Sequence, residues 1–74
     1  MDKQAIYDDL KRQILTLQLE PGTALDEARL SEHYKISRTP LREILRGLAG
    51  EGCVEIISNR GAYVSSMEYK VLRD

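Results

Sequence analysis

Two arginines stand four residues apart in the segment at residues 37–43, SRTPLRE, and their side chains are suited to binding anions or base edges. The guanidinium group is a planar fork of N–H donors that fits a phosphate, or the O6 and N7 atoms of guanine. Ser37 and Thr39 add short hydroxyl groups beside Arg38 and Arg42, and such groups also bind phosphate oxygens. The segment is therefore a candidate nucleic-acid contact, provided that a helix turns both arginines to one side.

A helix that begins at Arg38 meets this condition. Ser37 is a residue type that caps helix N-termini, and Pro40 is tolerated in a first turn because the N–H groups there have no intrahelical partner. With about 100° between successive residues, Arg38, Arg42 and Arg46 fall within roughly 80° of one another. The neighbouring face is apolar and consists of Leu41, Ile44, Leu45 and Leu48. We therefore predict that one face packs on the domain while the adjoining face presents the arginines.

The residues before this helix predict the other half of a helix-turn-helix. Apolar residues at helical spacing predict an amphipathic helix over residues 4–19, which Pro21 and Gly22 end. Its buried stripe would consist of Ile6, Leu10, Ile14 and Leu17. Asp26 predicts the N-cap of a short second helix, whose inward side chains would be Ala28, Leu30 and Tyr34. A three-residue turn that begins at Lys35 joins it to the third helix, which is the helix-turn-helix spacing.

Residues 50–65 change from a helical to a β pattern and predict a hairpin. Gly50 and Gly52 are suited to ending the third helix, one of them in a left-handed conformation. Residues 53–58 and 62–65 are rich in β-forming types, and residues 59–61 between them form a turn signal. Gly61 permits close backbone approach, and Arg60 at the tip either enters a minor groove or only keeps the turn soluble. The predicted fold class is mainly α with a small β-hairpin, a winged helix-turn-helix of three helices plus a wing.

Composition and charge limit the possible functions. The chain of 74 residues allows one small domain. Its net charge is −1, but residues 29–46 carry five positive and two negative charges, so a basic centre stands in an acidic frame. No apolar run is long enough to span a membrane, and the single Cys53 fits a reducing, cytoplasmic setting. One histidine and no cluster of metal-ligating residues offer no catalytic or metal site, so we expect neither an enzyme nor a cofactor in this chain.

The stretch PGTALDEARLSEHYKISRTPLREILRGLAGEGCVEIISNRGAYV resembles the DNA-binding domain of the GntR family of bacterial transcription regulators. The resemblance spans residues 6–65 and rests on the order and spacing of Pro21-Gly22, Leu25, SRTPLRE, the helix end at Leu48 to Gly52, and Arg60-Gly61 before Val64. The residues that it implies in contact with double-stranded DNA are Ser37, Arg38, Thr39 and Arg42, with Arg60 and Gly61 in the wing. Lys35 stands where the family usually has glycine, and it offers a further phosphate contact.

The RTPLRE form is most similar to the FadR-type branch, whose members carry an all-helical effector domain after the winged helix. That branch commonly binds small carboxylic acids there, often with a metal. The resemblance implies a homodimer in the full-length protein, a short palindromic operator, and repression until a small-molecule effector binds a domain outside this chain. We assign residues 1–66 to the DNA-binding domain and residues 67–74 to a linker or the start of a C-terminal effector and dimerisation domain.

Two alternatives stay open at this point. Arg46 would either contact DNA or pair with Glu43 or Glu51. The whole domain would otherwise serve as a protein-interaction or dimerisation module, since a net charge of −1 is unusual for a DNA-binding domain. Exposure of Arg38 and Arg42 on one face favours DNA, whereas pairing of either with the core or with Glu43 weakens that hypothesis.

Overall fold

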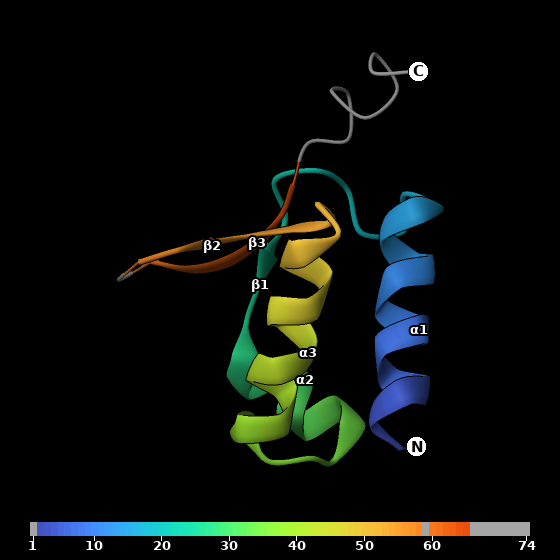
Figure 1. Ribbon diagram of the computed structural model, residues 1–74, viewed down its shortest axis with the longest axis vertical. Helices are drawn as coiled ribbons and strands as arrows, with labels where there is room; N and C mark the ends of the chain where they lie inside the picture. Colours follow the sequence, from blue (N-terminus) through green and yellow to red (C-terminus); the bar gives the residue numbers. More distant parts are fainter. Residues whose placement is uncertain (1, 59, 66–74) are drawn as a thin grey trace.

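The computed structural model describes residues 2–58 and 60–65, which form three helices and a small sheet (Figure 1). In chain order the elements are α1 (Lys3–Leu15), β1 (Ala24–Leu25), α2 (Glu27–Tyr34), α3 (Arg38–Gly50), β2 (Val54–Ile57) and β3 (Gly61–Val64). This arrangement confirms the predicted winged helix-turn-helix. The tail assigned to residues 67–74 lies outside the described residues.

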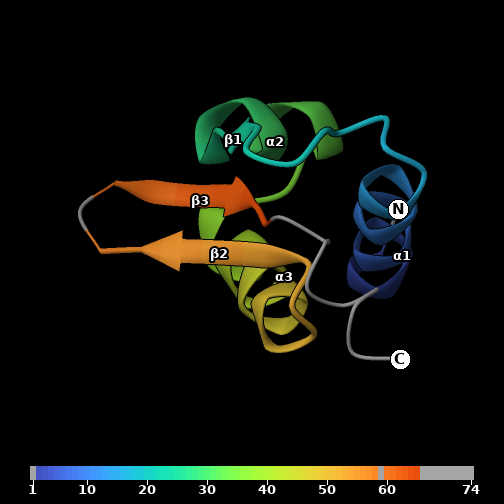
Figure 2. The ribbon, with the colours of Figure 1, turned by 90° about the horizontal axis from the view of Figure 1, so that it is seen from above.

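The sheet is antiparallel and has the order β1-β3-β2, so the hairpin strand β3 lies in its centre. Val54 pairs with Val64 and Ile57 with Gly61, while Ala24 and Leu25 of β1 pair with Tyr63 and Ala62. The hairpin projects to the side of α3 that lies away from α1, as both ribbon views show (Figures 1 and 2). Strand β1 was not predicted, because a strand of two residues is too short to show the alternation of apolar and polar side chains that indicates a strand.

The core lies between α1, α3 and the sheet, and it confirms the predicted apolar face of α3. The side chains with at most 2% exposure are Ile6, Leu10, Ile14, Leu41, Ile44, Leu45, Leu48, Cys53 and Val64. Burying one such aliphatic side chain stabilises the fold by about 1.5–3 kcal/mol. These contacts fix the rotation of α3 about its axis, and they thereby decide which of its side chains point outward.

Helix α1 ends four residues earlier than the predicted limit at residue 19. The N–H and hydroxyl groups of Thr16 both donate to the Arg12 carbonyl, and Leu17 adopts a left-handed conformation with φ 66°. The N–H of Leu19 then donates to the Gln13 carbonyl and closes the helix end. Leu17 is 58% exposed, so its predicted place in the buried stripe is wrong.

The turn between α2 and α3 has the predicted length and caps. The Asp26 carboxylate accepts hydrogen bonds from the N–H groups of Ala28 and Arg29, at 2.9 and 3.4 Å. Lys35 ends α2 in the left-handed region with φ 57°, a conformation that costs a side-chain-bearing residue about 1–2 kcal/mol. Ala28 is exposed rather than inward as predicted, whereas Tyr34 is buried and Leu30 is partly buried.

Hydrogen bonds of tyrosine hydroxyl groups help to attach α1 to the other helices. Tyr34 donates a hydrogen bond of 2.6 Å to the Asp9 carboxylate, which also accepts one from Gln13. On the side of α1 that faces α3, the Tyr7 hydroxyl donates a hydrogen bond to Glu51, the residue that caps the end of α3.

Within the described part of the chain, no helix is long and apolar enough to cross a membrane.

Candidate nucleic-acid interface

The predicted contact residues at the start of α3 are exposed. Ser37 occupies the N-cap, Arg38 is the first helical residue and Thr39 follows it. Ser37 makes no side-chain capping bond, so its hydroxyl group is left to other partners. The first N–H groups of a helix lack intrahelical acceptors and carry partial positive charge, which favours a phosphate. Lys35 is exposed in the preceding turn and adds a positive charge.

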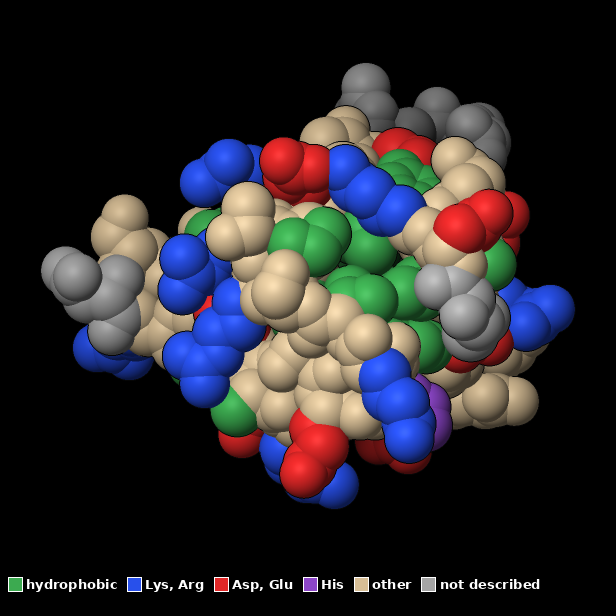
Figure 3. Space-filling view, turned by 90° about the horizontal axis from the view of Figure 1, so that it is seen from below, with side chains coloured by type: hydrophobic (Ala, Val, Ile, Leu, Met, Phe, Trp, Pro, Cys, Tyr) green, Lys and Arg blue, Asp and Glu red, His purple; other side chains and the backbone are tan. Residues whose placement is uncertain are grey.

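The next turns of α3 continue the basic face. Arg42 and Arg46 are exposed, while Leu41 and Leu45 beside them are buried in the core. Arg46 makes no ion pair with another residue of the described chain, and neither does Arg38. In the space-filling view from below, Lys and Arg side chains gather toward the side where the wing projects (Figure 3). The helix therefore presents its arginines beside the wing.

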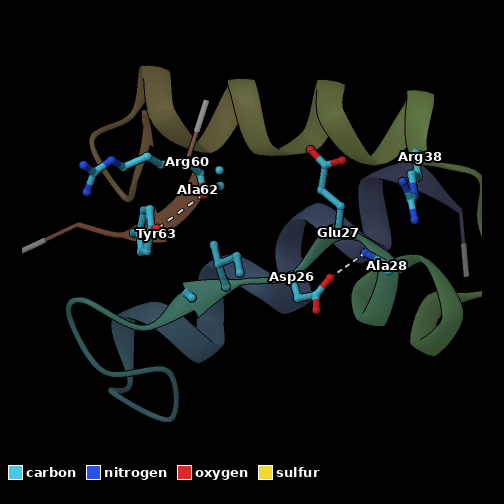
Figure 4. A pocket seen from close by; sticks show the side chains of 10 residues that line it. Asp26, Glu27, Ala28, Arg38, Arg60, Ala62 and Tyr63 are labelled. Carbon is cyan, nitrogen blue, oxygen red and sulfur yellow. Dashed lines mark hydrogen bonds between the residues drawn. The ribbon is translucent and has the colours of Figure 1, made fainter. Parts of the chain in front are cut away.

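The wing brings Arg60 and Gly61 to the same side of the molecule as Arg38. An open hollow of about 430 Å³ lies between them, and residues of β1, the start of α2, α3 and the wing line it. Figure 4 shows Arg38 on one side of this hollow and Arg60 on the other. Gly61 has φ 114°, and the space around its Cα would accept a Cβ, so its conformation rather than crowding favours glycine.

A second, smaller hollow joins α3 to the wing. That hollow measures about 120 Å³, and its lining includes Arg42, Arg46, Ile56 and Gly61. Glu27 lines this hollow as well as the larger one beside it. The two hollows share Glu27, Gly61 and Ala62 and together form a groove edge between α3 and the wing, with arginines in both.

The structure adds an ion pair that the sequence did not indicate. Arg42 Nε lies 3.1 Å from Glu27 Oε1 and donates a hydrogen bond to it. The Arg42 side chain remains 54% exposed, so it is not drawn into the core, and its ion-pair partner is Glu27 rather than Glu43. The condition set for a DNA-binding face is therefore met, although one arginine carries an acidic neighbour. Fifteen residues separate the pair on different helices, so no local spacing could have revealed it.

The two acids considered as partners of Arg46 lie instead against α1. Glu43 pairs with Lys3, and this hydrogen bond holds the pKa of the Glu43 carboxyl below its usual value. Glu51 lies 2.6 Å from Lys11 Nζ and accepts the Tyr7 hydroxyl. Hydrogen bonding to Glu51, with a smaller effect of burial, raises the pKa of Tyr7 to about 12. These acids therefore stabilise the α1–α3 contact.

The single histidine and the single cysteine of the chain pack against other residues of the fold. His33 packs edge-on against the Tyr34 ring, with 4.7 Å between ring centroids. Cys53 is a buried free thiol in the core. Among residues 2–58 and 60–65, no group of three or more His, Cys, Asp or Glu side chains is placed to hold a metal ion.

Comparison with known proteins agrees with this geometry. The family model described as "Bacterial regulatory proteins, gntR family" matches residues 2–64. A similar protein is an uncharacterized HTH-type transcriptional regulator in an unstable DNA locus of Streptomyces ambofaciens, which is 42% identical over 67 residues, covering 90% of this chain and 28% of that protein. The HTH-type transcriptional repressor RspR of Escherichia coli K12 is 37% identical over 71 residues, covering 96% and 31%.

Solved structures give the same result. A GntR family member from Pseudomonas syringae pv. tomato superposes with a TM-score of 0.81 at 29% identity, covering 97% of this chain and 32% of that one. A putative GntR regulator from Rhodococcus sp. RHA1 superposes with a TM-score of 0.82 at 25% identity, covering 86% and 31%. The chain thus spans less than a third of the length of these relatives.

Proposed function

The chain belongs to the GntR family of bacterial regulatory proteins and is a DNA-binding domain rather than an enzyme, and from this premise we propose how it binds. Helix α3 enters the major groove of double-stranded DNA with its N-terminal end leading. Arg38 and Arg42 contact base edges or phosphates there, and the Arg60-Gly61 wing rests on the backbone or in the minor groove.

One observation supports this proposal above the others. Arg38 and Arg42 are both exposed on the helix whose opposite face is buried, and Arg60 flanks the same groove edge. Ser37, Thr39 and Lys35 lie at the positively polarised start of that helix, where they suit phosphate contacts. Arg46 stands two turns further along, so we assign it a contact at the edge of the interface.

We also propose the wider setting of the domain. The full-length protein would be a cytoplasmic homodimer that binds a short palindromic operator and represses transcription until a small molecule binds a further domain. The name of the Escherichia coli relative describes a repressor, which supports this role. A two-fold symmetric site fits the way that paired helix-turn-helix domains dock on DNA.

The first experiment is fluorescence anisotropy with a random-sequence duplex pool over a series of salt concentrations. We expect log K to fall steeply with log salt, because each phosphate contact contributes a slope of about −0.9. The Arg38→Ala, Arg42→Ala double variant should lose most of the affinity and up to about two units of that slope.

A control variant tests whether DNA affinity depends on the arginines of this face or only on the total positive charge of the chain. Lys11→Ala with Arg12→Ala removes two positive charges from α1, on the side away from the wing (Figure 1). Both double variants are first compared with the wild type by thermal unfolding. Equal losses of affinity in the two variants would contradict the assigned face. The same measurement is made on a tandem fusion of two copies of the chain, which links two DNA-binding domains. Absence of DNA binding by this fusion at low salt would overturn the proposal.

A further inference from the structure

Glu27 occupies an unusual place on the basic face. It is the first residue of α2, and its side chain is 31% exposed. It lines the hollow that contains Arg38 and Arg60, and also the hollow that contains Arg42 and Arg46. Figure 4 shows its carboxylate directed from α2 toward α3, between Arg38 and Arg60. An acid at this point opposes phosphate binding, so its presence needs a separate physical reason.

The geometry of the ion pair supplies that reason. Glu27 accepts from Arg42 Nε, which is the inner donor of the guanidinium group. The two terminal amino groups form another edge of the same plane, and this edge remains suited to the O6 and N7 atoms of guanine. A long side chain held at its inner nitrogen has less freedom to lose when it meets a base.

We propose that Glu27 is a positioning residue that orients Arg42 for reading a base and weakens its binding to phosphates. This inference rests on the proposed function and adds a source of sequence discrimination to it. The carboxylate acts in two ways that differ in sign. It opposes non-specific binding through charge repulsion, and it favours the specific complex by ordering one guanidinium group.

The test uses a duplex selected from a random pool by the wild-type chain, and a scrambled duplex of equal length. The specificity ratio is the affinity for the selected duplex divided by that for the scrambled one. Glu27→Ala should bind the scrambled duplex more tightly than the wild type does, while its ratio falls by about two- to tenfold, the range that ordering one long side chain is worth. Selection repeated with Glu27→Ala should show a weaker base preference at one position in each half-site.

Three further variants test whether the specificity ratio depends on the placement of the Glu27 carboxylate or only on its negative charge. Glu27→Asp keeps the charge but shortens the side chain by one methylene, so its ratio should also fall. Glu32→Ala removes an acid from an exposed position of the same helix and should leave the ratio unchanged. In the Arg42→Ala background, Glu27→Ala should no longer lower the ratio, because the side chain that it orients is gone.

The outcomes distinguish this inference from the proposed function. If the wild type prefers its selected duplex but Glu27→Ala and Glu27→Asp keep the same ratio, Glu27 has no positioning role and DNA binding stands. If Glu27→Ala lowers the ratio equally with and without Arg42, the effect does not pass through Arg42 and the inference is wrong. If the wild type binds neither duplex at low salt, the proposed function fails and the inference fails with it.

Discussion

Replacement of Gly47 by alanine sets two effects of known direction against each other. An ideal Cβ atom at Gly47 would lie 2.8 Å from Cε2 of Tyr7 on α1. Alanine is favoured over glycine inside a helix by about 0.8–1.0 kcal/mol. Carbon atoms prefer separations of about 3.5–4.0 Å, so the Tyr7 ring has to retreat by about 0.7 Å or more.

The ring cannot retreat freely. Its hydroxyl donates to Glu51, which Lys11 also holds, and the ring packs against the core. Overpacking of this kind costs about 1–3 kcal/mol. We therefore expect Gly47→Ala to lower the free energy of unfolding by about 1 kcal/mol, which corresponds to about 4–8 °C in Tm for a domain of this size.

The assay is thermal unfolding followed by circular dichroism in a double-mutant cycle. Tyr7→Ala removes the ring, so Gly47→Ala in that background should raise the free energy of unfolding by about 0.8–1.0 kcal/mol. Tyr7→Phe keeps the ring but frees it from Glu51, and the effect of Gly47→Ala should then lie between the other two. An equal rise in Tm in all three backgrounds would show that the ring yields without cost, and the reasoning would be refuted.

Three further changes test the contacts and caps around the turn. The Tyr34 hydrogen bond lowers the pKa of Asp9, so the contribution of this contact to stability is complete above about pH 3.8 and is lost as pH falls through the lowered pKa. Urea unfolding should therefore show that the free energy of unfolding falls less between about pH 7 and about pH 3 for Asp9→Asn than for the wild type. Asp26→Ala removes the α2 cap and should cost about 1 kcal/mol, and an unchanged urea midpoint would contradict the capping role. Lys35→Gly relieves the left-handed strain and should raise the free energy of unfolding by about 1 kcal/mol, while the DNA salt slope falls by about 0.9 if Lys35 contacts a phosphate.

The parts of the fold that were predictable depend on local pattern. The apolar face of α3, the Asp26 cap and the hairpin follow from residues within a few positions of one another, and the structure confirms them. The end of α1 was not predictable in this way, because Leu17 continues the apolar spacing after the backbone has left the helix. Strand β1 likewise exists through its pairing with β3, which lies almost forty residues further along the chain.

The distribution of acids in space answers the objection raised by the net charge of −1. Glu43 and Glu51 stand on or next to the recognition helix in sequence, yet both pair with α1, through Lys3 and Lys11. Their charges are therefore compensated on the side of α3 away from the wing. Glu27 is distant in sequence but pairs with Arg42 on the basic face. A count along the chain assigns the wrong acids to the arginines, and only the packing of α1 and α2 on α3 decides which acid a bound DNA would meet.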